Sequence, residues 1–384
     1  MDPKNFSANI PGRVIRSPKG YFVFVPNPLP PNLEWTGNLV SALSAADRNL
    51  AALAKVGASF PVPQALIQPI IRKEAVLSSR IEGTRATYQE LVAFEIGQLP
   101  LFESADAREV HNYVRALTHG VKRLSNLPVS LRLIREMHSV LLEGVRGSAF
   151  TPGEFRRSQN WIGAPGSTLE TARFVPPPAD EMLEGLNDLE HFIHAKSDLP
   201  PLVRIGLAHY QFEAIHPFLD GNGRIGRLLI SLLLIAWELL PQPLLSLSEY
   251  IETNRQEYYD RLLAVSQQNE WEKWLLFFLR GVETQAQDTV QRVGRLAKLR
   301  TEYIEALREE RTKEKLTKVI DYLIETPITS ISNLQKQLKL SSFVTAQRYV
   351  ERLVEKGVLK EVTGKGRNRL YQASGIIKAL GLRV

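Results

Sequence analysis

The chain contains no cysteine and only 3 methionines among its 384 residues. The lack of cysteine excludes a disulfide framework, a thiolate metal site and a cysteine nucleophile, and it suits a reducing compartment. The longest apolar run, residues 228–240, falls well short of the roughly 20 residues that a membrane-spanning helix needs. The first residues also lack the charged-then-apolar layout of a signal peptide. We therefore expect a cytoplasmic protein without a membrane partner.

Charge is distributed unevenly along the chain. Residues 291–384 hold 20 basic and 10 acidic side chains, a net +10, whereas residues 1–290 hold 28 and 31, a net −3. A basic terminal segment beside a slightly acidic remainder indicates that residues 291–384 bind a polyanion and that residues 1–290 have a different function. A solvated basic face without a partner is the alternative.

The spacing of apolar residues predicts a mainly α-helical fold. Residues 1–35 are rich in Pro and Asn and are expected to form an irregular or short-stranded segment. Gly, Pro, Ser and Thr cluster over residues 149–178, which are expected to form a hairpin-like flap built on residues 155–162 and 173–176. Helices are expected over residues 39–55, 63–79, 86–96, 105–123, 130–142, 180–194, 201–216, 225–239, 247–266 and 270–311, the last of them bent or broken near Gly294.

The last 70 or so residues have the pattern of a winged helix-turn-helix. The expected elements are three helices, a strand, a basic turn and a second strand, over residues 313–325, 331–338, 344–356, 358–362, 363–368 and 369–372 respectively. In such a domain the third helix enters a major groove, which would bring Thr345, Gln347 and Arg348 near bases and the turn near phosphates. DNA is therefore the expected partner of this segment, and a protein surface is the alternative.

The densest chemical signal is the segment His216-Pro-Phe-Leu-Asp-Gly-Asn-Gly-Arg-Ile-Gly-Arg227. Its glycines match a dinucleotide-binding pattern and nearly match a P-loop. Both matches fail on context, because the preceding residues are expected to be helical rather than a buried strand, and the P-loop lysine is absent. What remains is a loop of small residues ahead of a helix, whose backbone N–H groups and positive dipole end favour a phosphate.

The charged residues of this segment suit phosphate chemistry. Arg224 and Arg227 are three residues apart, so on a helix they share a face and can clamp phosphate oxygens. Asp220 is placed to hold Mg²⁺ beside phosphates. His216 is a candidate general base near neutral pH. Each residue alone has an ordinary structural explanation, but all four within twelve residues favour a catalytic site.

The segment resembles the Fic motif, His-Pro-Phe-x-Asp/Glu-Gly-Asn-Gly-Arg-x-x-Arg, at every fixed position, and the resemblance extends over about residues 70–290. It implies a protein adenylyltransferase, which moves AMP from Mg-ATP to a Ser, Thr or Tyr hydroxyl of a protein and releases pyrophosphate. By the same resemblance His216 activates the hydroxyl, Asp220 coordinates Mg²⁺ and Phe218 anchors the loop. The nucleotide-binding residues it implies are Gly221, Asn222, Gly223, Arg224, Ile225, Gly226 and Arg227.

Gly223 and an upstream segment refine the resemblance. In the phosphate-transferring branch of the superfamily a lysine stands where this chain has Gly223, so AMP transfer is expected here. The segment from Ser78 to Thr84, with Glu82 at its centre, is similar to the inhibitory motif Ser/Thr-x-x-x-Glu-Gly/Asn of Fic proteins whose inhibitory helix precedes the catalytic domain. In that class the glutamate pairs with the second motif arginine, here Arg227, and displaces the γ-phosphate. The same glutamate could position a water that removes AMP.

Further assignments follow from the resemblance. The flap resembles the family hairpin that docks an extended target segment as an added strand. Tyr250 stands where family members contact adenine, although an aromatic residue in a helix is more often part of the core. The other histidines show no metal-ligand pattern and are interpreted as structural: His111, His119, His138, His191, His194 and His209.

The resulting prediction is an autoinhibited adenylyltransferase with a Fic helical core, a small β-hairpin flap and a C-terminal winged helix. The expected division is an N-terminal region with the inhibitory helix, a catalytic domain, a linker helix and the winged helix, over residues 1–110, 111–290, 291–312 and 313–384. A nucleic-acid-binding regulator that uses the Fic core as a nucleotide sensor is the alternative from another class. The sequence leaves open the identity of the target, the balance of AMP addition and removal, and whether the chain forms a homodimer.

Overall fold

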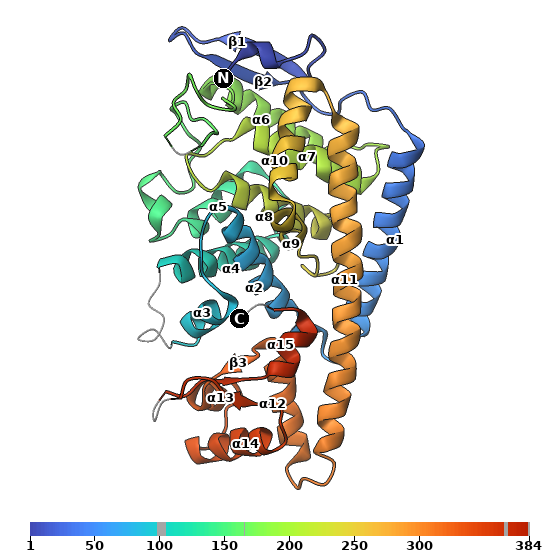
Figure 1. Ribbon diagram of the computed structural model, residues 1–384, viewed down its shortest axis with the longest axis vertical. Helices are drawn as coiled ribbons and strands as arrows, with labels where there is room; N and C mark the ends of the chain where they lie inside the picture. Colours follow the sequence, from blue (N-terminus) through green and yellow to red (C-terminus); the bar gives the residue numbers. More distant parts are fainter. Residues whose placement is uncertain (98–104, 165, 365–367, 383–384) are drawn as a thin grey trace. The chain divides into compact units, whose positions relative to one another are not determined.

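The computed structural model describes residues 1–97, 105–164, 166–364 and 368–382 (Figure 1). Within these ranges the chain is mainly helical with small antiparallel sheets, which confirms the predicted class. It divides into two compact units. The first comprises Met1–Leu50, Arg115–Leu239 and Leu247–Thr284, and the second comprises Ala51–Val114, Leu240–Ser246 and Gln285–Val384.

The first unit combines a hairpin with a group of helices. Strands β1 (Gly12–Arg16) and β2 (Phe22–Pro26) pair antiparallel. The helices that lie wholly in this unit are α5 (Leu131–Leu141), α6 (Ala179–His194), α7 (Pro201–Ile215), α8 (Asn222–Ala236), α9 (Ser248–Thr253) and α10 (Arg255–Gln268). Three helices contribute residues to both units: α1 (Gly37–Ser59), α4 (Ala105–Arg123) and α11 (Trp271–Ala306).

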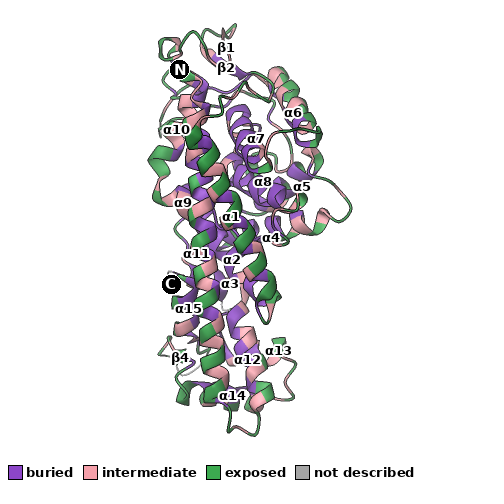
Figure 2. Cartoon of the chain, turned by 90° about the vertical axis from the view of Figure 1, so that its right-hand side faces the viewer, coloured by how far each residue is buried: buried purple, intermediate pink, exposed green. Residues whose placement is uncertain are grey.

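Helix α7 is the centre of the first unit. It packs against α6, α8, α10 and β2, and Figure 2 shows α7 and α8 almost entirely in the colour of buried residues. A helix covered on all sides must be apolar around its whole circumference, and the buried Leu207, Phe212 and Ile215 of α7 fit that requirement. The indole N–H of Trp274 in α11 donates to the carbonyl of Gly206 at 2.9 Å. Helix α7 therefore holds the start of the segment from His216 to Arg227 in a fixed position.

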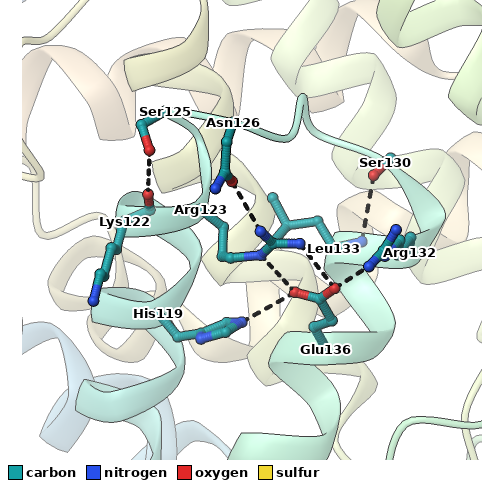
Figure 3. Close-up of polar contacts among 9 residues, drawn as sticks. All are labelled: His119, Lys122, Arg123, Ser125, Asn126, Ser130, Arg132, Leu133 and Glu136. Carbon is teal, nitrogen blue, oxygen red and sulfur yellow. Dashed lines mark hydrogen bonds and ion pairs between the residues drawn. The ribbon is translucent and has the colours of Figure 1, made fainter.

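An ion-pair cluster joins the part of α4 that lies in this unit to α5 (Figure 3). The carboxylate of Glu136 accepts hydrogen bonds from Arg123 Nε at 2.8 Å and from Arg132 Nε at 3.1 Å, and its Oε2 lies 3.2 Å from His119 Nε2. These contacts lower the pKa of Glu136 to about 2, chiefly through the hydrogen bond from Arg123. Helix α5 begins at a capping serine, Ser130, whose side chain accepts from the backbone N–H of Leu133.

The second unit contains α2 (Pro63–Ile81), α3 (Tyr88–Glu95) and the C-terminal elements. These follow in the order α12 (Lys313–Glu325), β3 (Ile328–Thr329), α13 (Ile331–Gln337), α14 (Phe343–Glu355), β4 (Lys360–Glu361), β5 (Tyr371–Gln372) and α15 (Ser374–Leu380). The three strands form an antiparallel sheet in the order β3-β5-β4. Ser330 and Ser342 cap α13 and α14 by accepting from the backbone N–H of Asn333 and of Thr345.

Helix α2 packs directly against α12 and α3 within the second unit. The buried guanidinium of Arg72 in α2 donates to Glu95 Oε2 of α3 at 2.7 Å and to the carbonyl of Glu325, at the end of α12, at 2.6 Å. The other oxygen of Glu95 lies 3.3 Å from His111 Nδ1. Because Arg72 satisfies a helix-terminal carbonyl and a carboxylate together, it fastens these three helices to one another.

Three expected features differ from the structure. Helix α11 runs unbroken through Gly294, because the neighbouring Val293 and Leu296 are buried and their packing outweighs the roughly 1 kcal/mol cost of a helical glycine. The helix expected over residues 247–266 is two helices, separated at Asn254, whose side chain donates to the carbonyl of Tyr250. The expected flap hairpin has one isolated bridge, between Ile162 and Phe174.

In the C-terminal segment the three predicted helices and two predicted strands occur in the predicted order, although β4 and β5 are shorter than expected. Strand β3 and helix α15 were not predicted from the sequence. Residues 365–367 of the expected basic turn lie outside the described residues. Among the helices in the described ranges, none is both long and apolar enough to cross a membrane.

Candidate active site

The turn between α7 and α8 presents His216. This residue ends α7 in the left-handed conformation, with φ 49° and ψ 62°, which costs a residue with a Cβ about 1 kcal/mol. Its Nδ1 lies 3.3 Å from the carbonyl oxygen of Glu213. Since a carbonyl only accepts, Nδ1 carries the proton in the neutral ring and Nε2 carries the lone pair. The geometry therefore sets Nε2 as the basic nitrogen.

The loop after His216 is held by its own side chains. Phe218 is fully buried, and its backbone N–H donates to Asn222 Oδ1 at 2.8 Å while its carbonyl accepts from Asn222 Nδ2 at 2.8 Å. The ring of His138 stacks on Phe218, with centroids 3.7 Å apart and planes 8° from parallel. Asn222 thus closes the loop with two hydrogen bonds and is also the first residue of α8.

The N-terminus of α8 forms the base of the candidate phosphate site. Gly221, at φ 79°, precedes the helix in a conformation that favours glycine. Gly226 lets α8 approach α7 closely, since a Cβ there would lie 2.2 Å from Glu213 Oε1. The first-turn N–H groups and the helix dipole favour an anion. Gly223 and Ile225 lie in this first turn, and Arg224 and Arg227 are 3% and 2% exposed.

Asp220 lies at the edge of this loop. Its Oδ1 accepts from the N–H of Gly221 at 2.6 Å and lies 3.4 Å from Arg224 Nη2. Its side chain is one-third exposed. Among the described residues no group of three or more His, Asp or Glu side chains is arranged to hold a metal ion. The donor set is therefore one carboxylate beside a phosphate loop, which fits Mg²⁺ shared with substrate phosphates and does not fit a metal cage made of protein ligands alone.

Two buried histidines near the site are neutral. His138 Nδ1 accepts from the N–H of Gly153 at 2.8 Å and its Nε2 donates to the carbonyl of Asp220 at 3.0 Å. Burial lowers the pKa of His138 to about 4. His209 lies between Gly226 O and the Tyr258 hydroxyl, and burial lowers its pKa to about 3. His138 links α5, the flap and the loop, a connection that its sequence context did not reveal.

Arg156 and Asn160, in the flap, also reach the loop. Arg156 is 2% exposed and donates from Nε to the carbonyl of His216 at 3.0 Å. Asn160 donates from Nδ2 to the same carbonyl at 3.2 Å and to that of Phe218 at 2.8 Å. No local pattern indicated this role, because a buried arginine among flap residues resembles a surface charge until the fold is known.

The remaining predicted residues lie elsewhere. Tyr250 is in the first unit, half-buried on α9 with its ring 5.1 Å from that of Phe277, and burial raises its pKa. Ser78 and Glu82 belong to the second unit. Ser78 is fully buried in α2, and Glu82 is the exposed residue at which that helix ends. The structure thus gathers His216, Asp220 and the residues from Gly221 to Arg227 into one continuous site.

Comparison with known families and proteins adds to this geometry. Residues 40–122 match the profile described as Fic/DOC family N-terminal, and residues 128–234 match the Fic/DOC family profile. The chain is 33% identical over 132 residues to the protein adenylyltransferase Fic of Drosophila virilis, and 30% identical over 165 residues to that of Aedes aegypti. These matches cover 33% and 41% of the chain but only 25% and 30% of the relatives.

Solved structures agree on the fold. A Fic family protein from Desulfovibrio desulfuricans G20 superposes with a TM-score of 0.58 at 20% identity, covering 90% of this chain and 98% of that one. Fic-1 from C. elegans gives 0.51 at 24% identity, covering 69% and 75%. The family profiles span the helix α2 and the whole segment from His216 to Arg227. Residues 40–122 and 128–234 thus match the two Fic/DOC profiles, and the solved structures show that the fold is that of Fic proteins.

Proposed function

We propose that this protein transfers AMP from Mg-ATP to a Ser, Thr or Tyr hydroxyl of a protein target. The observation that carries the proposal is the tautomer of His216, whose Nδ1 contact to Glu213 leaves the lone pair on Nε2, directly ahead of the phosphate-binding start of α8. The names of the relatives from Drosophila virilis and Aedes aegypti, protein adenylyltransferase Fic, support the same reaction.

In the proposed reaction Nε2 of His216 takes the proton from the target hydroxyl. The hydroxyl oxygen attacks the α-phosphorus, a new P–O bond forms, and the bond between that phosphorus and the α–β bridging oxygen breaks. Pyrophosphate leaves with the electron pair of that bond. The N–H groups of Asn222 and Gly223 bind the transferred phosphate, and Gly221, whose N–H donates to Asp220 Oδ1, shapes the loop beside them. Arg224, Ile225, Gly226 and Arg227 complete the nucleotide site, with the arginines on the remaining phosphates.

In this proposal Asp220 would hold Mg²⁺, and the ion would supply positive charge that neutralises the pyrophosphate leaving group. Oδ1 of Asp220 accepts from the N–H of Gly221, which holds the carboxylate at the start of the proposed phosphate loop. The adenine is assigned to the neighbourhood of Tyr250, whose half-buried ring keeps an exposed part.

Control and target binding complete the proposal. Glu82, with Ser78 in the same helix, inhibits by pairing with Arg227 and displacing the γ-phosphate, and the same carboxylate supports removal of AMP by positioning a water. The flap, with main-chain groups near the Ile162–Phe174 bridge, receives an extended target segment as an added strand. The proposed cytoplasmic location rests on the lack of cysteine, and the sequence leaves a homodimer open.

Replacing His216 with Ala tests the reaction. Transfer should fall about 10²- to 10⁴-fold, because a general base is lost, while ATP binding should stay nearly unchanged, because the ring contacts no phosphate in this mechanism. Self-labelling with ATP labelled at the α-phosphate measures the first quantity, and calorimetry the second. Wild-type labelling by His216→Ala would refute the assignment. ATP binding without labelling by Glu82→Gly, in which the proposed inhibition is released, would favour the nucleotide-sensing regulator.

For the C-terminal segment we propose a winged helix domain over residues 313–384, joined by a linker helix, 291–312, to a catalytic domain, 111–290, and an N-terminal region, 1–110. Helix α14 opens with the exposed apolar pair Phe343 and Val344 and carries the exposed Arg348 one turn later. Together with the net charge of +10 over residues 291–384, this supports a DNA-binding helix whose apolar residues contact thymine methyl groups.

The DNA assignment is tested on the full chain. Binding to duplex DNA should weaken steeply as salt rises, and Arg348→Ala should lower affinity about tenfold at fixed salt. Fluorescence anisotropy at several salt concentrations measures both effects. Absence of binding, or binding that does not respond to salt, would instead favour a protein surface as the partner of α14.

A further inference from the structure

We propose that Arg156 is a positioning residue for the general base, holding the turn at the end of α7 so that the ring of His216 presents Nε2 to the target hydroxyl. The inference rests on the proposed role of His216 and goes beyond it, because it assigns the orientation of the base to a flap residue that touches neither nucleotide nor target hydroxyl.

Arg156 bonds to three successive carbonyls at this turn. Its Nε donates to His216 O at 3.0 Å, its Nη2 lies 3.4 Å from Ile215 O, and its own backbone N–H donates to Pro217 O at 2.9 Å. The C-terminal carbonyls of a helix lack intrahelical partners, and a cation there also meets the negative end of the helix dipole. Arg156 therefore acts as a side-chain cap for α7 at the residue that carries the base.

The other side of the guanidinium is anchored as well. Nη2 donates to Pro177 O at 2.5 Å and Nη1 to Ser158 O at 3.2 Å. Every acceptor that the guanidinium bonds is a main-chain carbonyl. Because Arg has a rigid planar fork with fixed donor directions, bonds on both sides determine the position of the carbonyls relative to the flap. Arg156 thus holds the turn at His216 in a fixed position relative to two segments of the flap, at Ser158 and Pro177.

The electrostatics favour this role. Burial lowers the pKa of Arg156 to about 10, so the side chain still carries its charge at neutral pH. A buried cation without bonding partners would be costly, and here carbonyl dipoles supply the compensation. Asn160 adds two bonds, to the carbonyls of His216 and Phe218, so the flap holds the carbonyls on both sides of Pro217.

The link to catalysis is the backbone conformation of His216. The left-handed turn is unfavourable for a residue with a Cβ and persists only where its surroundings hold it. The contact from His216 Nδ1 to Glu213 O depends on that turn, and it fixes both the tautomer and the direction of the ring. Without Arg156 the turn can relax, and the ring then samples other orientations and both tautomers.

The first test is the kinetics of Arg156→Gln, with self-labelling of the full chain as the assay. We expect kcat to fall about 100-fold, as for other small displacements of a catalytic group, with KM for ATP changed less than about threefold. The matched control is Arg132→Gln, an exposed arginine of the same unit whose partner Glu136 keeps Arg123 (Figure 3). The control should retain wild-type kinetics.

The second test reads the ring itself and needs no activity. With ¹⁵N-labelled histidine, and the His216 signals assigned by their loss in His216→Ala, the wild type should show a protonated Nδ1 and an unprotonated Nε2. Arg156→Gln should show a mixture of tautomers. Free guanidinium at non-denaturing concentration should partly restore kcat to Arg156→Ala, because it can occupy the vacated position.

These measurements separate the two proposals. Absence of labelling by Glu82→Gly, in which the proposed inhibition is released, would overturn the adenylyltransferase assignment, while the His216 spectrum would still test Arg156. A kcat within about twofold of wild type together with an unchanged tautomer in Arg156→Gln would overturn the positioning role. If that variant does not fold, Asn160→Ala should show the same spectral change with a smaller loss of kcat, and an unchanged spectrum there would equally overturn it.

Discussion

At the scale of single residues, His209 illustrates how burial controls charge in the support of the site. Its ring contacts Gly226 O and the Tyr258 hydroxyl inside the first unit. Burial lowers its pKa to about 3, whereas an exposed histidine titrates near 6.5. Between these values the unfolded chain binds more protons than the folded one, so this contribution to stability is complete above about pH 6.5 and is lost as pH falls.

The loss of this stabilisation at low pH can be measured. His209→Gln removes the titrating group, so the free energy of unfolding of the variant should depend less on pH than that of the wild type. The difference between the two proteins should shrink by about 2 kcal/mol from pH 7 to pH 5. Urea denaturation at both values measures it. Parallel pH dependence in the two proteins would show that His209 is protonated in the folded state.

Individual site residues show which parts of the site could be predicted from the sequence and which could not. His216, Asp220 and Arg224 could be recognised because they lie within a few positions of one another, and local spacing is visible in a sequence. Arg156 reaches His216 across 60 residues, and nothing local distinguishes it from its exposed neighbour Arg157. Contacts of this kind depend on how the flap folds back over α7, which a single sequence does not encode in any short pattern.

At the scale of secondary-structure elements, hydrophobic periodicity located most helices, and packing decided the exceptions. The continuity of α11 through Gly294 follows from buried neighbours, and the end of α9 follows from the side chain of Asn254. The short strands β3, β4 and β5 contain two residues each. Such strands are too brief to produce a recognisable alternation, which explains why β3 was missed and the other two were drawn too long.

Helix α14 offers a test at this scale. Ser342 caps it by accepting from the N–H of Thr345 at 3.1 Å, so Ser342→Ala should destabilise the helix by about 1 kcal/mol. Hydrogen exchange at the first amides of α14 should speed up accordingly. Ser341→Ala is the matched control, since Ser341 is exposed and does not cap the helix. Equal exchange in both variants would contradict the capping role.

At the scale of the whole molecule, the two parts of the proposed control come from different compact units, Glu82 from the second and Arg227 from the first. If the carboxylate competes with the γ-phosphate for Arg227, Glu82→Gly should raise AMP transfer about 10- to 100-fold, the equivalent of one charge-assisted hydrogen bond of about 1.5–3 kcal/mol. Self-labelling at equal protein concentration with Mg-ATP measures the change.

Two further variants complete this test. Glu82→Gln keeps the size of the side chain and removes its charge, so it should activate as Glu82→Gly does. Adding Arg227→Ala to Glu82→Gly should return transfer to a low level, because released inhibition is useful only if the arginine can hold the phosphate. Equal labelling by wild type and Glu82→Gly would leave Glu82 as a helix-end carboxylate.

The bonds of Arg72 have a consequence for how this protein can change in evolution. Helix α2, which ends at Ile81 directly before Glu82, packs against α12 of the C-terminal segment, and Arg72 bonds to the carbonyl of Glu325. Loss of the segment that contains α12 would leave α2 without helices that bury it, although the two segments are far apart in sequence. Recombination is therefore expected to exchange them as a pair, and a lineage that replaces one should also alter the facing surface of the other.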